Sequence, residues 1–340
     1  LDVQRHQGAG IATYLAEYLA FFVRAAFRLA RDHARRRYAL VQVATLPDWL
    51  VFAALPLRLT GVPVILDLHE ATPEFFASRF PGAANAVLRW LLQATERASI
   101  AAATHAVTVN DALRARLLGL GVAAERISIV PNSPSLARFD RAAYPARPFM
   151  ADATLRLIFA GGLTPTYEVD VAVRAIAALR DRRPELPTAL EIYGRGDSQP
   201  ELERLVTQLD LADRVSLRGR IPIEDVPAAI ARADVGLATT RLDSFTEASL
   251  STKIFEYAAM GKPVVCARLP LVDRTFPPEA VRRYASGDPG SLADQIVALI
   301  DDAAARDAGI EAARTIVERH SWEHDAPAYL DLLERFARDR

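Results

Sequence analysis

The sequence predicts an α/β protein made of two doubly wound domains, each with a parallel sheet. The chain has 340 residues, of which 51% are hydrophobic, enough for two buried cores. Along its length, short β-branched runs alternate with glycine or polar turns and amphipathic helical patterns. This alternation is typical of βαβ units, whose strands pair in parallel.

The first half contains four predicted strands, and apolar patterns with helical spacing separate most of them. Since the second half contains six, we expect the first βαβ portion of the N-terminal domain to be missing from this chain. The predicted strands are residues 41–43, 62–67, 106–109 and 127–130, and the predicted helices include 49–59 and 84–103.

The second half repeats the strand and helix alternation more regularly. Ser291 and Asp294 form a capping-box pattern that predicts a helix over residues 292–300. The predicted strands are residues 155–160, 189–193, 215–217, 235–238, 264–267 and, more weakly, 282–285. The predicted helices between them are residues 169–180, 199–209, 226–232 and 252–260.

A stretch without periodicity, residues 140–153, separates the two series and contains Pro145 and Pro148. It predicts an N-terminal Rossmann-like domain over residues 1–147 and a C-terminal one over residues 148–320.

Composition excludes several classes of function. The 41 basic and 42 acidic residues leave a net charge of −1, which gives no global attraction to nucleic acid. The single cysteine, Cys266, excludes a disulfide framework and fits a reducing cytoplasm. The six histidines are scattered, and no apolar run reaches the length of about 18 residues that a membrane span needs.

Three loops in the second half follow predicted strands, at the ends where open α/β sheets bind ligands. The first contains Gly161 and Gly162, and the second contains Gly194, Arg195 and Gly196. The third begins after residue 238, includes Arg241, and leads into the helix that carries Lys253 and Glu256.

These residue types suit a nucleotide diphosphate. Glycines let backbone N–H groups approach phosphate, and the start of a helix favours anions. Lys253 would meet the diphosphate as a point charge, and a carboxylate at Glu256, three residues on, would accept ribose hydroxyls. Each feature also has a plain alternative, because glycine pairs form tight turns and a Lys–Glu pair often lies on a solvated helix face.

At these residues the sequence resembles the retaining glycosyltransferases of family 4, which have the GT-B fold. Residues 251–265, STKIFEYAAMGKPVV, are similar to the family's Lys-x-x-Glu-Tyr motif with its following Gly-x-Pro-Val-Val. Further similarities lie in residues 231–237, in Val130-Pro131-Asn132-Ser133 and in Ser321-Trp322-Glu323. The resemblance covers nearly the whole chain.

The resemblance implies two Rossmann-like domains that face each other across a cleft. It implies an acceptor site in the N-terminal domain, a nucleotide-sugar site in the C-terminal domain, and a terminal helix, residues 321–340, that crosses back to the N-terminal domain. It also implies sugar transfer with retention of the anomeric configuration, with no metal and no cofactor besides the nucleotide-sugar.

The sequence departs from the family pattern in two places. Ala248 stands where the family has a first glutamate, and Glu247, one residue earlier, is the candidate that would contact the donor sugar. Gly162 and the pair Thr166-Tyr167 stand where the family has an arginine and a lysine. The positive charge would then come from Lys253, Arg241 or Arg195.

Candidate acceptor-side residues lie in the first half. His69 ends a predicted strand and matches by context a histidine near the family's cleft, although a histidine satisfied in a turn fits equally well. With a normal pKa near 6.5, it would lie beside the reacting centre and exchange protons. Glu70, Glu74 and Asp48 are expected to be acceptor-side carboxylates.

Residues 14–37 combine aromatic and apolar side chains at helical spacing with six arginines. One interpretation is a helix packed on the core with a solvated arginine face. The other is a helix that lies on an anionic bilayer, with a lipid-linked sugar as acceptor.

We therefore expect a cytoplasmic glycosyltransferase, peripheral to the inner face of the membrane, that acts in polysaccharide or glycoconjugate biosynthesis. Its partners would be a nucleotide-sugar donor and a glycan or lipid-linked acceptor, without nucleic acid. The alternatives are a nucleotide-sugar epimerase of the same fold and a non-catalytic binding module.

Overall fold

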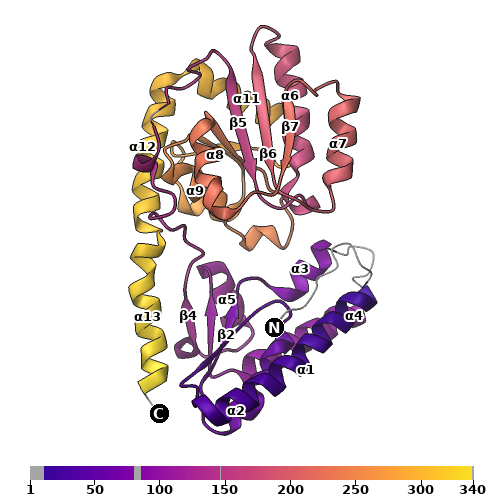
Figure 1. Ribbon diagram of the computed structural model, residues 1–340, viewed down its shortest axis with the longest axis vertical. Helices are drawn as coiled ribbons and strands as arrows, with labels where there is room; N and C mark the ends of the chain where they lie inside the picture. Colours follow the sequence, from indigo (N-terminus) through magenta and orange to yellow (C-terminus); the bar gives the residue numbers. More distant parts are fainter. Residues whose placement is uncertain (1–10, 80–85, 146, 339–340) are drawn as a thin grey trace. The chain divides into compact units, whose positions relative to one another are not determined.

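The computed structural model describes residues 11–79, 86–145 and 147–338. The chain divides into two compact units, Leu1–Asn132 with Asp325–Arg340, and Ser133–His324. Each unit contains one fully parallel sheet, of four strands in the first and six in the second. The predicted α/β class is therefore confirmed, with all ten predicted strands present within one to three residues (Figure 1).

The sheet of unit 1 has the sequential order β1-β2-β3-β4. Alternate side chains of β2 and β3 point to opposite faces, which gives each face its own core. One face packs on η1, α2 and α4, and the other, through Ile65 and Val107, packs on Leu332 of α13. The elements are α1 (Ile11–Arg36), β1 (Val41–Ala44), η1 (Asp48–Ala54), α2 (Leu55–Leu59), β2 (Val64–Leu68), α3 (Thr72–Arg79), α4 (Ala86–Ala102), β3 (His105–Thr108), α5 (Asp111–Gly119), η2 (Ala124–Arg126), β4 (Ile127–Ile129) and α13 (Trp322–Arg338).

The sheet of unit 2 has the doubly wound order β10-β9-β8-β5-β6-β7. Its core includes buried side chains from every strand and from α6, α7, α9 and α11. The elements are η3 (Arg141–Ala143), β5 (Leu155–Ala160), η4 (Pro165–Tyr167), α6 (Val169–Arg182), β6 (Thr188–Tyr193), α7 (Gln199–Gln208), β7 (Val215–Gly219), η5 (Ile223–Asp225), α8 (Val226–Arg232), β8 (Val235–Ala238), η6 (Thr246–Ala248), α9 (Thr252–Ala259), β9 (Val264–Ala267), α10 (Pro270–Thr275), β10 (Arg282–Tyr284), α11 (Pro289–Asp301) and α12 (Ala303–Arg319).

Two local predictions need correction. The capping box at Ser291 is wrong, because α11 begins at Pro289 and Asp288 caps it by accepting the N–H groups of Gly290 and Ser291. Proline at the first position needs no hydrogen-bond partner, so the helix starts two residues before Ser291. The predicted helix over residues 49–59 is a 3₁₀ helix, η1, followed by the short α2.

Candidate active site

The candidate site lies at the carboxyl edge of the central strands of unit 2. Strands β8, β5 and β6 are neighbours in the sheet, so the loops that follow them leave from one edge. These are the three loops that the sequence singled out, and the structure brings them together.

The glycines of these loops are required by close packing. A side chain on Gly194 would place its Cβ within 3.0 Å of the Gly161 carbonyl oxygen, and one on Gly196 would meet the Leu163 backbone equally closely. A Cβ on Gly161 would overlap the Lys253 side chain, whereas one on Gly162 would have only ordinary contacts, the nearest at 3.5 Å. Gly161, Gly194 and Gly196 thus let the loops after β5 and β6 meet each other and Lys253.

Lys253 lies in the first turn of α9, and only 8% of the residue is exposed to solvent. Its Nζ lies 3.9 Å from the centre of the Tyr167 ring and 5.5 Å from that of Phe159. Within the described part of the chain, this ammonium group has neither a hydrogen bond nor an ion pair. Burial lowers the pKa of Lys253 to about 8, and the charge of Glu256 partly opposes that shift.

Lysine is rare in this chain, which has only two lysines, Lys253 and Lys262, among 41 basic residues. Lys262 donates a hydrogen bond to the Ala231 carbonyl oxygen at 2.8 Å, so it has a structural role in joining its segment to α8. Across the part of the chain that the structure describes, Lys253 has no hydrogen-bond partner of this kind. A compact ammonium whose pKa shifts on burial differs from an arginine, which stays charged and needs room for its planar fork.

Glu256 lies one turn after Lys253 and is half-buried. Burial raises the pKa of the Glu256 carboxyl, against the positive charge of Lys253, a hydrogen bond from Thr252 and the charge of Arg138. The carboxylate and the ammonium group are therefore electrostatically coupled on one side of α9.

The loop between β8 and α9 is folded by its own hydrogen bonds. The Asp243 carboxylate accepts the N–H groups of Phe245 and Thr246, and the Thr246 hydroxyl donates to the Arg241 carbonyl oxygen at 2.5 Å. The side chains of Arg241 and Glu247 are exposed on this loop, and Arg195 is exposed on the loop after β6. Among the described residues, none of the three forms a hydrogen bond or an ion pair with Lys253 or Glu256, so these side chains lie at the rim of the site.

Glu168, which is buried directly before α6, was not among the residues that the sequence analysis identified. Its carboxylate accepts hydrogen bonds from the Tyr284 hydroxyl at 2.7 Å, the Ser286 hydroxyl at 3.1 Å and the Gly287 N–H at 3.2 Å. Only its left-handed backbone, with φ of +30°, marks it as unusual, and that property is invisible in a sequence.

In unit 1, His69 follows β2. Its Nε2 lies 3.2 Å from Asp67 Oδ2, and its backbone N–H donates to the Thr45 hydroxyl. The hydrogen bond to Asp67 raises the pKa of His69 more than burial lowers it, and a hydrogen bond with Asn132 adds to the rise. Burial also raises the pKa of the neighbouring Glu70.

Asp48 and Glu74 belong to an acidic cluster around Arg116. Arg116 pairs with Glu96 at 2.5 Å and with Glu74 at 3.1 Å. Asp48 is buried, and one of its oxygens accepts the Thr72 hydroxyl at 2.7 Å while the other has no partner within the described residues. Burial raises the pKa of Asp48 to about 6. The sequence offered no signal for Arg116 or Glu96, which lie on helices far from Asp48 in the chain.

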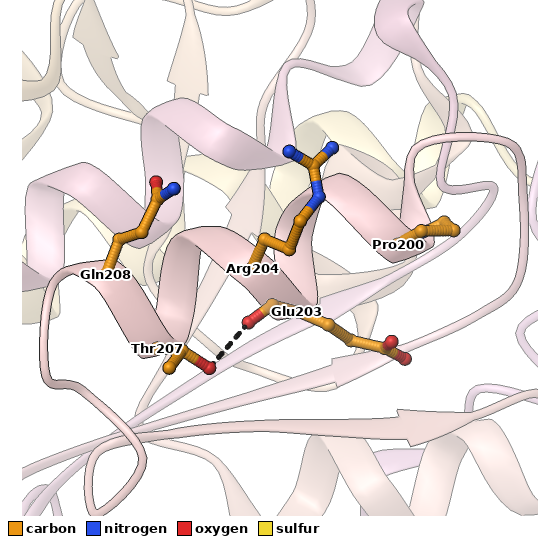
Figure 2. A pocket seen from close by; sticks show the side chains of 5 residues that line it. All are labelled: Pro200, Glu203, Arg204, Thr207 and Gln208. Carbon is orange, nitrogen blue, oxygen red and sulfur yellow. Dashed lines mark hydrogen bonds between the residues drawn. The ribbon is translucent and has the colours of Figure 1, made fainter.

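Two further observations concern the surroundings. Among the described residues, no group of three or more His, Cys, Asp or Glu side chains is arranged to hold a metal ion. A shallow hollow lies on the outer face of α7 and includes neither a loop glycine nor Lys253 (Figure 2). Its lining residues, Pro200, Glu203, Arg204, Thr207 and Gln208, all come from that one helix, so it is not part of the site.

Comparisons with known proteins agree with this geometry. The family model "Glycosyl transferases group 1" matches residues 154–302, and "Glycosyl transferase 4-like domain" matches residues 1–133. A D-inositol 3-phosphate glycosyltransferase of Pseudarthrobacter chlorophenolicus is 30% identical over 213 residues, which are 61% of this chain and 50% of that protein.

A GDP-mannose-dependent alpha-(1-6)-phosphatidylinositol monomannoside mannosyltransferase of Mycolicibacterium smegmatis is 36% identical over 108 residues, 31% of this chain and 28% of that protein. The chain thus spans about half the length, or less, of these curated relatives.

Solved structures share the fold. Anabaena Alr3699/HepE in complex with UDP aligns with a TM-score of 0.69 at 15% identity, over 91% of this chain and 82% of that one. A glycosyltransferase from Rickettsia africae aligns with a TM-score of 0.69 at 13% identity, over 99% and 85%. With both family models matched and this GT-B fold in both units, the chain belongs to the group 1 glycosyltransferases of family 4.

Proposed function

We propose that unit 2 binds a nucleotide-sugar at the carboxyl edge of its sheet, and that the protein transfers the sugar to an acceptor with retention of configuration. The observation that carries this proposal is the buried Lys253 ammonium group at the start of α9, which forms no ion pair and no hydrogen bond among the described residues. A buried charge without a partner is costly, and a diphosphate at this position would supply the missing anion.

The roles of the donor-side residues follow from their positions. Lys253 stabilises the negative charge that develops on the leaving diphosphate, and the loops of Gly161, Gly162, Gly194 and Gly196 leave room for it. Glu256 accepts the ribose hydroxyls. Because the ammonium group and the start of α9 supply positive charge, we propose that transfer needs no metal and no cofactor.

Three exposed side chains at the rim complete the proposed donor site. Arg195 and Arg241 add positive charge beside the diphosphate, and Glu247 contacts the donor sugar. The family's usual arginine and lysine are absent, which is why we assign a share of the charge to these two arginines.

On the acceptor side, His69 carries a raised pKa and has an accessible ring, which suits a group that lies beside the reacting centre. Glu70 is the adjacent carboxylate, while Asp48 and Glu74 hold the loops after β1 and β2 through Thr72 and Arg116. The named relatives act on an inositol phosphate and on a phosphatidylinositol mannoside, which favours a polyhydroxylated, phosphate-bearing or lipid-linked acceptor.

Calorimetry with UDP, GDP and their hexose conjugates tests the donor proposal. We expect binding by the wild-type chain and its loss in Lys253→Met. Turnover is then measured with glycan and lipid-linked acceptors in EDTA, and the anomeric proton coupling of the product reports retention. Release of an epimerised sugar without acceptor would identify an epimerase, and donor binding without any turnover would identify a binding module; either result would overturn the transferase.

We also propose that the protein works in the cytoplasm at an anionic membrane surface, through α1. Leu19, Val23 and Phe27 form an outward stripe with exposures of 58%, 58% and 69%. Arg24, Arg28, Arg31 and Arg35 form the adjoining stripe, so the helix offers apolar side chains beside positive charge. Trp90 on α4 is also exposed. No described helix is long and apolar enough to cross a bilayer.

Co-sedimentation with vesicles of phosphatidylcholine and phosphatidylglycerol tests the membrane proposal. We expect binding that weakens with salt, that falls in Arg24→Gln/Arg28→Gln/Arg31→Gln, and that also falls in Val23→Ser/Phe27→Ser. Unchanged sedimentation of both variants, or a dimer that buries α1 in solution, would contradict it.

A further inference from the structure

Tyr167 holds an unusual position beside the proposed donor site. It ends η4 and its ring lies under the Lys253 ammonium group, with Nζ 3.9 Å from the ring centre. Phe159 closes the corner from β5, with its ring centre 6.3 Å from that of Tyr167. The ammonium group thus sits in an aromatic corner against the Gly161 backbone.

The backbone of this turn is fixed independently of Lys253. The Thr239 hydroxyl donates to the Tyr167 carbonyl oxygen at 2.6 Å, and the Arg241 N–H donates to the Thr166 carbonyl oxygen at 2.8 Å. Both donors come from the loop that follows β8, so this loop and the turn after β5 are held together. The backbone of Tyr167 is therefore held by the fold rather than by the contact between its ring and the lysine.

Glu168, the next residue, strengthens the same turn. It is a non-glycine residue with φ of +30° and ψ of +48°, in the left-handed region that β-carbon-bearing residues rarely adopt. Such a conformation persists where surrounding bonds over-determine it, and here the Tyr284, Ser286 and Gly287 donors do so. Glu168 thus links Tyr167, the last residue of η4, to the start of α6 through a fixed backbone conformation.

We propose that Tyr167 is the positioning residue for Lys253: its ring stabilises the charged ammonium group and aims it at the donor diphosphate, in place of the basic side chain that the family has here. This inference rests on the proposed donor-binding function. A carboxylate at this position would also stabilise the ammonium group, but it would neutralise the charge and compete with phosphate. An aromatic face attracts the cation without adding a counter-charge.

The surroundings explain why such help is needed. Burial lowers the pKa of Lys253 to about 8, close to the pH at which the group has to be charged. Glu256 is the charged group that acts on Lys253, and Arg138 in turn acts on Glu256. Without the ring, the charge of Glu256 alone would oppose the effect of burial on the pKa of Lys253.

The test exploits the small number of lysines. Pulse acylation with acetic anhydride across pH 6–10 labels the amines of Lys253 and Lys262. Mass spectrometry reads the two lysines in separate peptides, and Lys262 serves as the internal reference. The midpoint of each profile reports the pKa, whereas its amplitude reports access. The variants are Tyr167→Leu, Tyr167→Phe, and 3,4,5-trifluorophenylalanine at position 167, which keeps the ring's shape and removes its negative face.

We expect the Lys253 midpoint to fall by about one pH unit in Tyr167→Leu and in the trifluoro variant, a roughly tenfold shift between ammonium and amine. Tyr167→Phe should titrate like the wild type, and the Lys262 midpoint should not move in any variant. An unchanged Lys253 midpoint in the trifluoro variant, whose fold is preserved by design, would overturn the proposal even if Tyr167→Leu proves unstable.

Binding of UDP and GDP supplies the second readout. We expect affinity at pH 7.5 to fall about threefold in the trifluoro variant, because the charged fraction of Lys253 falls by that factor, and to recover nearly fully at pH 6.5, where most of the amine is protonated again. If the wild type binds neither nucleotide, the donor-binding function fails, while the acylation profile still decides whether Tyr167 controls Lys253. A loss of affinity that persists at pH 6.5 would show a steric role and contradict the proposal.

Discussion

The carboxyl edges of the two sheets handle buried charge in opposite ways. In unit 2, the buried Lys253 ammonium group forms no ion pair among the described residues, and only the charge of Glu256, three residues on, acts on it from nearby. In unit 1, the carboxylates of Asp48, Glu74 and Glu96 surround the single guanidinium of Arg116. The first arrangement leaves a cation without a direct ion pair, and the second has more carboxylates than cations.

This difference indicates which of the two sheet edges is suited to bind an anionic ligand. A buried cation without a partner is unfavourable in the fold alone, and an incoming diphosphate removes that cost. The acidic cluster is already joined by Arg116 and Thr72, so its members hold loops together. This comparison supports our proposal of a donor site in unit 2 and a site for the hydroxyl-bearing acceptor beside His69 in unit 1.

Removal of the unpartnered cation should have the largest effect. Lys253→Met keeps the side chain's bulk, and we expect kcat/KM for the donor to fall about 1000-fold because charge stabilisation of the leaving group is lost. Lys253→Arg should not restore it, since the planar guanidinium meets the Gly161 backbone. Lys262→Met is the matched control, and equal losses in both variants would show that folding, not the site, was damaged.

A second variant displaces the Lys253 side chain without removing it. Gly161→Ala forces the Lys253 side chain away from its position, and we expect nucleotide affinity to fall about 30-fold as the charge is displaced. Gly162→Ala, one residue later, meets only ordinary contacts and should bind nearly as the wild type does. Isothermal calorimetry of both variants with UDP and GDP provides the measurement.

In unit 1, the excess of carboxylates predicts a stability that depends on pH. The pKa of Asp48 is raised in the folded state, from 3.8 to about 6, so folding binds a proton here. Its contribution to stability is present at low pH and is lost as pH rises through about 6. Asp48→Asn should therefore raise the free energy of unfolding by about 2 kcal/mol at pH 8, with no gain at pH 4.

Urea unfolding at the two pH values, followed by tryptophan fluorescence, measures this difference. Glu74→Gln is the control, because Glu74 is partly exposed and removing its charge should not add stability at pH 8. A gain for Asp48→Asn that is the same at both pH values would mean that the Asp48 carboxyl does not carry the pH dependence.

The smallest effects should come from the exposed arginines at the rim of unit 2. We expect Arg195→Gln and Arg241→Gln each to weaken nucleotide binding about threefold at low salt, and less at 0.5 M NaCl, because exposed charges are screened. Arg204→Gln on α7, at the hollow of Figure 2, is a matched exposed control that should change nothing. A salt-independent loss would place the arginine in direct contact with the ligand.

Much of the fold follows from local sequence patterns. The ten strands coincide with β-branched runs, and the helix at Lys253 follows from its apolar periodicity and the motif around it. The start of α11 was missed because Ser291 and Asp294 matched a capping box, while Pro289 allowed an earlier start. Near the end of a helix, several local patterns predict different first residues with similar strength. A single backbone hydrogen bond is then enough to shift the start of the helix.

The sequence by itself determined the α/β class, the two glycine loops, the loop after β8 and the pair Lys253 and Glu256, because these depend on residues close together in the chain. Only the tertiary structure decided that Tyr167 and Phe159 surround Lys253, that Glu168 fixes their turn and that Arg116 joins the carboxylates of unit 1. These contacts join residues on different strands and helices. Their proximity depends on strand order and loop packing, which no short stretch of sequence encodes.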